Sequence, residues 1–137
     1  TRLDATGMRD GQRAGMCTLS GDYTWIGIIQ DLGIRRLAFV TGDSKSGPSP
    51  PQFGPEVAQS LVWLKLEYNR AKGTFYYSFD GRSFTPLGPR NYSYQSTWYE
   101  GTKAGLFNYS RSDFAGGGVV YFDFFHQQHD GPAIVPH

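Results

Sequence analysis

The chain has 137 residues, a length typical of one domain, and 39% of them are hydrophobic, as in an ordinary globular protein. Its formal net charge is +1 and its Lys and Arg residues are scattered, so it lacks the concentrated positive charge that a nucleic-acid backbone requires. No apolar run approaches the ~20 residues of a membrane span. We therefore expect a single module over residues 1–137, with no nucleic-acid and no membrane partner.

The composition favours an all-β fold. The chain contains 18 Gly, 8 Pro and 16% aromatic residues. This mixture suits short strands joined by tight turns, because glycine supplies positive-φ corners and aromatic side chains suit pleated surfaces. Cys17 is the only cysteine, which excludes an intrachain disulfide and a multi-cysteine zinc site. We expect its thiol to be buried.

Strand-like runs fill the first part of the chain. Residues 1–5 already alternate like a strand in progress, and the chain starts at Thr1 rather than at Met, which we interpret as an excised or processed piece. Residues 13–19, 23–29 and 34–41 each follow a turn that contains glycine, and they have the length and composition of strands. These runs predict the start of a meander.

A loop is predicted over residues 43–55, because this stretch is rich in Ser, Gly and Pro, and proline cannot donate a hydrogen bond to a sheet. Its length exceeds that of a simple hairpin turn, and such loops are often functional or mobile. Over residues 62–68, apolar side chains then alternate with Trp63, Lys65 and Glu67. The alternation predicts a half-buried strand with one apolar face.

A hairpin is predicted after this strand. Residues 74–79 are aromatic and strand-like, and they lead into Asp80-Gly81, a dipeptide that accepts the positive φ angles of a type I′ turn. Residues 83–87 form the returning strand. We expect this strand to be short or to lie at a sheet edge, because it contains Pro86.

The last part of the chain contains an aromatic, polar connection and two more strands. The connection covers residues 91–100, the strands cover residues 103–109 and 119–126, and a loose tail is predicted from about residue 127. Neither a helix nor an internal repeat is indicated. About eight short strands with regularly spaced turn signals predict an antiparallel β-sandwich of the jelly-roll or lectin-like kind.

Four segments, in this order along the chain, together resemble one known family. It is the C-terminal concanavalin A-like β-sandwich domain of family 43 glycoside hydrolases of the β-xylosidase and arabinofuranosidase type. The resemblance covers about residues 1–125, and its centre is the hairpin Phe75–Gly88 (FYYSFDGRSFTPLG). The other matching segments are DGQRAGM at 10–16, YTWIG at 23–27, and the pair KAGLF at 103–107 and VYFDFF at 120–125.

The resemblance implies a non-catalytic domain that packs against a five-bladed propeller carrying the active site. In some members the domain binds xylan, and in some a loop reaches over the catalytic pocket. The family has further strands before the position of Thr1, so we expect this chain to lack one or more N-terminal strands. We favour an extracellular or periplasmic location for an enzyme of this kind.

Binding of a neutral polysaccharide requires flat apolar surfaces for sugar rings and polar groups for hydroxyls, and Tyr and Trp side chains supply both. The candidate sugar-binding residues are therefore the aromatic residues outside the expected core: Trp25, Trp63, Tyr76, Trp98, Tyr23 and Tyr99. We expect a xylan-type polysaccharide or oligosaccharide as the ligand. The catalytic glycoside hydrolase domain of the full-length protein is the expected protein partner.

Each candidate has a structural alternative. Trp63 lies on the polar face of its strand, where it either contributes to a ligand or partner surface or packs beneath a neighbouring loop. Trp25 and Tyr23 share a strand face with Gly27, which either leaves room for a sugar ring or makes Trp25 a core residue lying over glycine. Tyr76 either lines a groove or lies on a solvated face.

The acidic residues do not indicate a catalytic pair. A glycosidase needs two carboxyl groups flanking the scissile bond, whereas most aspartates adjoin a glycine in a turn, where the side chain has a local backbone role: Asp10, Asp22, Asp43, Asp80 and Asp130. We expect no catalytic residue and no cofactor, although a carboxylate pair among Glu56, Glu67 and Glu100 and a structural calcium ion are left open. His126 and His129 face opposite sides of a strand, so we expect no zinc site.

Two functions are therefore carried forward. The first is a carbohydrate-binding module of an enzyme that degrades plant polysaccharides. The alternative is a structural accessory domain that packs on the catalytic propeller and shapes its active site without affinity of its own for sugar.

Asp123 interrupts an aromatic run, and we expect its carboxylate to be partly exposed or hydrogen-bonded, because a buried lone carboxylate is costly.

Overall fold

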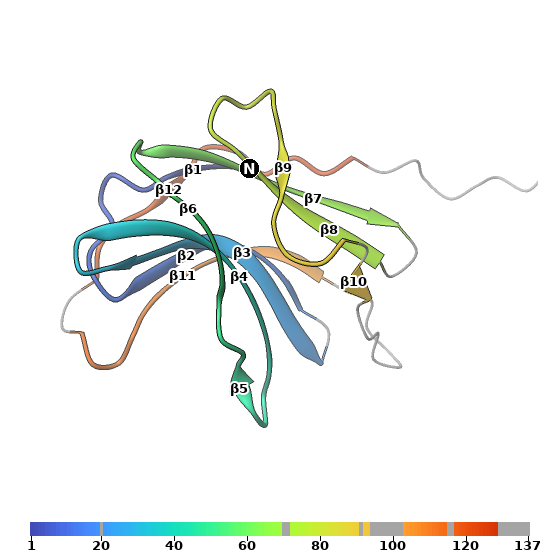
Figure 1. The fold of residues 1–137 in the computed structure, drawn as a ribbon, viewed down its shortest axis with the longest axis horizontal. Coiled ribbons are helices and arrows are strands. Elements are labelled where there is room, and N and C mark those ends of the chain that lie inside the picture. The colour runs from blue at the N-terminus through green and yellow to red at the C-terminus, as the bar shows by residue number, and fades with distance from the viewer. Residues whose placement is uncertain (20, 70–71, 91, 94–102, 115–116, 129–137) are drawn as a thin grey trace, which may run out of the picture.

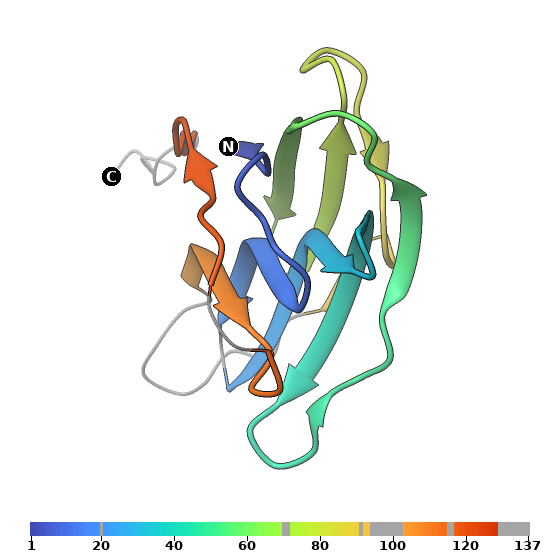
Figure 2. The same ribbon diagram turned by 90° about the vertical axis from the view of Figure 1, so that its left-hand side faces the viewer.

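In a computed structural model the chain forms two antiparallel β-sheets that face each other (Figures 1 and 2). The structure describes residues 1–19, 21–69, 72–90, 92–93, 103–114 and 117–128. None of these residues belongs to a helix with the length and hydropathy of a membrane span. The predicted antiparallel β-sandwich is confirmed.

The sheet that we call the β7 sheet has the strand order β10-β8-β7-β1-β12, with β9 paired to β8. Its strands are β1 (Arg2–Asp4), β7 (Leu61–Asn69), β8 (Lys72–Ser78), β9 (Thr85–Pro86), β10 (Tyr92–Ser93) and β12 (Tyr121–Phe122). The β3 sheet has the order β11-β2-β3-β4-β5, with β6 paired to β4. Its strands are β2 (Gln12–Leu19), β3 (Asp22–Asp31), β4 (Ile34–Asp43), β5 (Gly47–Pro48), β6 (Gln52–Glu56) and β11 (Lys103–Ser110).

The core lies between the two sheets. Its largest fully buried side chains come from both of them: Leu3, Ile26, Ile28, Leu37, Leu64 and Phe75. Alternate residues of each strand point into this space, as the pleat requires. Six of the predicted strands are confirmed as β2, β3, β4, β7, β8 and β11, which are the six longest strands in the described part of the chain.

The loop predicted over residues 43–55 is wrong in part, because β5 and β6 lie within it. Both strands pair with β4 at the edge of the β3 sheet, and the register of β6 shifts between Arg36 and Ala38. Proline is tolerated in an edge strand, because its missing amide faces away from the sheet. The prolines of this stretch therefore limit β6 to an edge without excluding a strand.

The predicted hairpin turn and last strand also need correction. Gly81 has a positive φ of 74°, but Asp80 does not, so the turn is not type I′. Instead, Asp80 Oδ1 accepts the amide protons of Arg82 and Ser83 at 2.8 Å each, and the returning strand shortens to Thr85–Pro86. The strand predicted over residues 119–126 shortens to Tyr121–Phe122.

Parts of two other predictions lie outside the described residues. Of the aromatic connection at residues 91–100, the structure describes the backbone of β10 alone. Most of the predicted tail, from residue 129 onward, is also outside the described part. Cys17 is buried, and burial raises the pKa of its thiol, as expected for a structural cysteine.

Candidate functional site

The β3 sheet is apolar on both of its faces. All six residues of β3 from Thr24 to Ile29 are buried, and so are residues 37–40 of β4. In a sheet with one solvated face, buried and exposed residues alternate, whereas a run of buried residues is typical of strands covered on both sides. The outward-facing residues therefore form a second packed cluster on the outer face of this sheet: Cys17, Trp25, Ile29, Ala38 and Val40, with Tyr23 and Phe107 packed against them.

Strand register explains how this cluster is assembled. Trp25 lies between Cys17 and Val40 on neighbouring strands, and in the next row Gly27 lies between Gly15 and Ala38. Because these three residues have small side chains or none, the surface of the sheet is low in this row, beside the indole ring of Trp25. The rings of Trp25 and Phe107 then pack with their centroids 5.0 Å apart, and those of Phe107 and Tyr109 are 5.9 Å apart.

Partly exposed side chains surround this cluster. Tyr109 is 47% exposed, Phe53 and Leu19 are exposed to a similar extent, and Tyr23 is half-buried. Burial raises the pKa of Tyr109. The nearby cation of Arg13 acts in the opposite direction and lowers this pKa, but the effect of burial is larger. We define the outer face as the second packed cluster together with these surrounding residues. Aromatic and aliphatic side chains are exposed at its margin.

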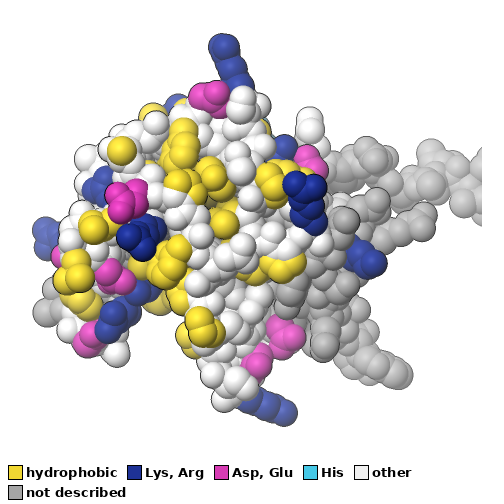
Figure 3. Space-filling view, in the orientation of Figure 1, with side chains coloured by type: hydrophobic (Ala, Val, Ile, Leu, Met, Phe, Trp, Pro, Cys, Tyr) yellow, Lys and Arg dark blue, Asp and Glu magenta, His cyan; other side chains and the backbone are white. Residues whose placement is uncertain are grey.

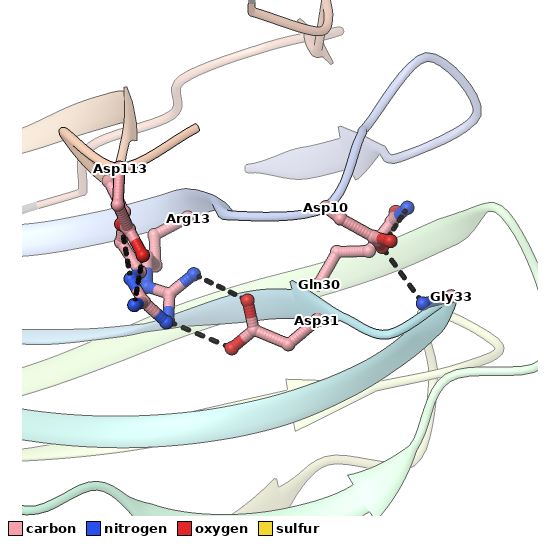
Figure 4. Close-up of polar contacts among 7 residues, drawn as sticks. Asp10, Arg13, Gln30, Asp31, Gly33 and Asp113 are labelled. Atoms are coloured by element: carbon pink, nitrogen blue, oxygen red, sulfur yellow. Dashed lines mark hydrogen bonds and ion pairs between the residues drawn. The ribbon is translucent and has the colours of Figure 1, made fainter. Parts of the chain in front are cut away.

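Two arginines on the outer face are paired with carboxylates. Arg13 donates two hydrogen bonds to Asp31, at 2.9 and 3.2 Å (Figure 4). Arg36 lies 3.5 Å from Glu56, and its guanidinium also covers the ring of Phe53, 5.7 Å from the centroid. On the face shown in Figure 3, hydrophobic side chains gather around β6, and acidic and basic side chains lie next to each other. These pairs leave little net charge on this part of the surface.

The structure places Trp25 and Tyr23 together on the outer face, as the shared strand face predicted. Trp25 is only 5% exposed, which is the burial that the alternative of a core aromatic over glycine predicts. The ring of Tyr23 lies over Gly42, where an added Cβ would be 2.3 Å from the Tyr23 hydroxyl. These two residues therefore pack against their own sheet.

Trp63 and Tyr76 lie on the outward face of the other sheet, away from Trp25. Trp63 packs beneath the loop that follows β8, where a Cβ at Gly81 would lie 2.8 Å from the indole ring, and the guanidinium of Arg2 covers it at 5.8 Å. The ammonium of Lys65 lies 4.8 Å from the centroid of the Tyr76 ring. Both rings thus already have partners. Trp98 and Tyr99 lie outside the described residues.

Asp43 and Asp80 have the local backbone roles predicted for them, whereas Asp10 binds a neighbouring turn and Asp130 lies outside the described residues. Asp10 accepts the amide proton of Gly33 at 2.9 Å and a bond from Gln30 (Figure 4), and Asp43 accepts the amide protons of the two residues that follow Ser44. Asp123 is exposed and pairs with Arg2, as expected. In the described part of the chain, no three His, Cys, Asp or Glu residues gather as a metal site would require.

Sequence reasoning missed Phe53 and Tyr109 as surface residues of interest. The sequence predicts a loop at Phe53, although this residue lies in β6 beside Ala38. It predicts a strand at Tyr109 but does not specify which face of the sheet the side chain occupies. The run Tyr23–Ile29 is mostly apolar and contains no charged residue, and this is the sequence signal for a sheet covered on both sides. Such a signal directs attention to the outer face of the sheet, where Phe53 and Tyr109 lie.

Comparison with known proteins gives consistent matches. The family model for the β-xylosidase C-terminal concanavalin A-like domain matches residues 1–128. A β-xylosidase of Formosa agariphila is 25% identical over 132 residues, which make up 96% of this chain and 21% of that protein.

Two solved structures have the same fold. One is a GH43 glycoside hydrolase engineered to display both endo-xylanase and exo-arabinofuranosidase activity. It superposes with a TM-score of 0.76 and 30% identity over 87% of this chain and 26% of that chain. The other is a bifunctional GH43-CE protein of Bacteroides eggerthii, with a TM-score of 0.69, 26% identity, and coverage of 87% and 16%. The chain therefore spans about a quarter or less of each of these relatives.

Proposed function

Because the chain belongs to the family of β-xylosidase C-terminal concanavalin A-like domains, we propose that it packs against the catalytic domain of a family 43 glycoside hydrolase through the outer face of the β3 sheet. Its role there is structural: it supports the catalytic domain and carries no catalytic group of its own. The outer face is defined above by its packed cluster and its partly exposed margin.

The observation that carries this proposal is the apolar character of both faces of the β3 sheet. A sheet with two apolar faces is typically covered on both sides, and the β7 sheet covers only one of them. The aromatic margin, with Tyr109 and Phe53, has the composition found at the centre of protein interfaces. Burying the exposed half of each ring would contribute about 1 kcal/mol to the free energy of binding.

The paired charges support the same function. Moving a lone charge into an interface has a high desolvation cost, whereas a charge that keeps its partner is tolerated better. Arg13 and Arg36 each carry their own carboxylate into the contact. The outer face therefore suits a protein surface without strong charge of either sign.

This proposal is tested by adding the chain in trans to a family 43 catalytic domain that lacks its own accessory domain. We expect the catalytic domain to melt at a higher temperature when the chain is present, and calorimetry to detect binding. Tyr109→Glu should weaken this binding at least tenfold, because it places an unpaired charge in the contact. Tyr121→Glu is the matched control: Tyr121 is 66% exposed and pairs with Asp4 in the other sheet.

Circular dichroism would establish that both variants fold. An equal effect of the two substitutions, or no stabilisation by the unmodified chain, would contradict the proposed contact. Phe53→Gln provides an independent variant on another strand, and we expect it to weaken binding by a smaller factor.

Binding of xylan or a related β-glycan is the second candidate function. It is favoured by the strip of Trp63, Tyr76 and Phe84 on the outward face of the β7 sheet, where Lys65 lies between the last two rings. Affinity electrophoresis with xylan, arabinoxylan and cellulose tests it, with Tyr76→Ala as the variant that should weaken retardation. Trp98 and Tyr99 are candidates for the same test.

A further inference from the structure

The turn between β3 and β4 carries an exposed leucine in an unfavourable backbone conformation. Asp31 and Ile34 pair directly, so Leu32 and Gly33 form a two-residue hairpin turn. Both turn residues have positive φ angles, 51° for Leu32 and 74° for Gly33. In the described part of the chain, Leu32 is the only residue other than glycine with a positive φ. Leucine rarely adopts this conformation, because its Cβ comes close to the carbonyl oxygen that follows.

Leu32 gains little from the fold in return. It is 92% exposed, the highest value among the exposed large hydrophobic residues in the described part of the chain. A turn with two positive φ angles favours Asn-Gly, and asparagine at this position would be both polar and less strained. Leucine thus contradicts two local rules at one position. Such contradictions are expected where a residue serves binding rather than folding.

The turn is fixed by hydrogen bonds on both sides. Gln30 and Asp31 point to opposite faces of the sheet, because successive residues of a strand alternate. On one side, Asp10 accepts hydrogen bonds from the Gly33 amide at 2.9 Å and from the Gln30 side chain at 3.3 Å (Figure 4). On the other side, Asp31 accepts the two bonds from Arg13. A side chain on a fixed turn loses little conformational freedom when a partner buries it.

The turn also continues the outer face of the β3 sheet. Ile34 is 44% exposed and lies on the same side of β4 as Arg36 and Ala38, because alternate residues of a strand share a face. Ala38 belongs to the second packed cluster, and Arg36 is paired with Glu56. Leu32 and Ile34 therefore add apolar surface at the end of the proposed contact with the catalytic domain.

We propose that Leu32 is an anchor of that contact and inserts its side chain into an apolar recess on the catalytic domain. The inference rests on the proposed function and names a residue that determines its affinity. Leucine is almost fully exposed in the isolated chain, so its burial contributes more to binding than that of a side chain already half-covered. The recess carries no unpaired charge, because the arginines near the turn keep their own carboxylates.

The test compares Leu32→Asn with Leu32→Met, using the same catalytic domain added in trans. Asparagine suits the turn and removes apolar surface, whereas methionine keeps an apolar side chain of similar size. We expect Leu32→Asn to raise the melting temperature of the isolated chain by about 3 °C. The same substitution should weaken binding to the catalytic domain about tenfold or more. Leu32→Met should change the affinity by less than about threefold.

The opposite signs of the two effects distinguish an anchor from a residue that only supports the fold. If Tyr109→Glu weakens binding and Leu32→Asn does not, the inference is overturned while the proposed contact stands. If the unmodified chain does not bind the catalytic domain, the proposed contact fails and the inference fails with it. Sedimentation of the isolated chain tests a second copy as the occupant. A dimer that Leu32→Asn dissociates would overturn the inference in favour of self-association.

Discussion

Gly15 and Gly27 approach each other so closely across β2 and β3 that neither can carry a side chain. A Cβ at Gly15 would lie 2.1 Å from the Ile26 carbonyl oxygen, and a Cβ at Gly27 would lie 2.1 Å from the Ala14 carbonyl oxygen. The obstructing atoms belong to the backbone and cannot move aside. The low sheet surface beside the indole ring of Trp25 therefore depends on these two glycines.

Gly27→Ala should destabilise the chain by about 2 kcal/mol or more, because the added methyl group must push two central strands apart. Gly105→Ala is the control, since its Cβ would meet only the Cys17 sulfur at an ordinary 3.7 Å. We expect that substitution to be close to neutral. Urea unfolding of both variants measures the difference, and similar midpoints would contradict the close approach of the two strands.

Trp63→Ala should lower the free energy of unfolding by about 2 kcal/mol, because the indole ring packs against Gly81 and the Arg2 guanidinium. Tyr121→Ala is a suitable comparison: Tyr121 lies on the same outward face but is largely exposed. We expect its effect to stay within about 0.5 kcal/mol. If Trp63→Ala left stability unchanged, the ring would be available for a ligand instead.

The long strands were predictable because the pattern of apolar and polar residues that identifies each strand lies within the strand itself. Alternation in residues 62–68 identified β7 and its inward face correctly. β6 was missed because it exists only through pairing with the edge of β4, a relationship that is not local in sequence. The same reason explains β12, where only Tyr121 and Phe122 satisfy the register with β1.

The candidate site was less predictable than the fold. The face of Trp63 followed correctly from alternation, but its environment depends on the loop after β8, which turns back so that Gly81 meets the indole ring. That loop conformation is determined by hydrogen bonds to Asp80 rather than by a two-residue turn. Sequence periodicity thus specifies which side of a strand a residue occupies, but not what covers it.

Asp31→Asn should destabilise the chain by about 1 kcal/mol, because it leaves the charge of Arg13 without its partner. The Arg13 side chain is only 12% exposed and makes two hydrogen bonds to the carboxylate. Glu56→Gln tests the contrast, since it removes the exposed partner of Arg36 and should change stability little. Chemical denaturation at low and high salt would distinguish the two pairs, and equal losses would contradict this ranking.

Asp80 should make the stability of the chain depend on pH in the acid range. The amide protons of Ser83 and Arg82 and the hydroxyl of Ser78 lower the pKa of its carboxyl from 3.8 to about 2. Because the folded pKa lies below the unfolded value, the carboxylate stabilises the fold above pH 3.8, and this contribution is lost as the pH falls from about 3.8 toward 2.

Asp80→Asn should remove this part of the pH dependence, so that the stabilities of the two proteins converge near pH 2. Urea unfolding between pH 2 and pH 6 measures this convergence, with Asp22→Asn as a control at the exposed first residue of β3. A constant difference between the unmodified chain and Asp80→Asn over this range would show that the loop is held by other contacts.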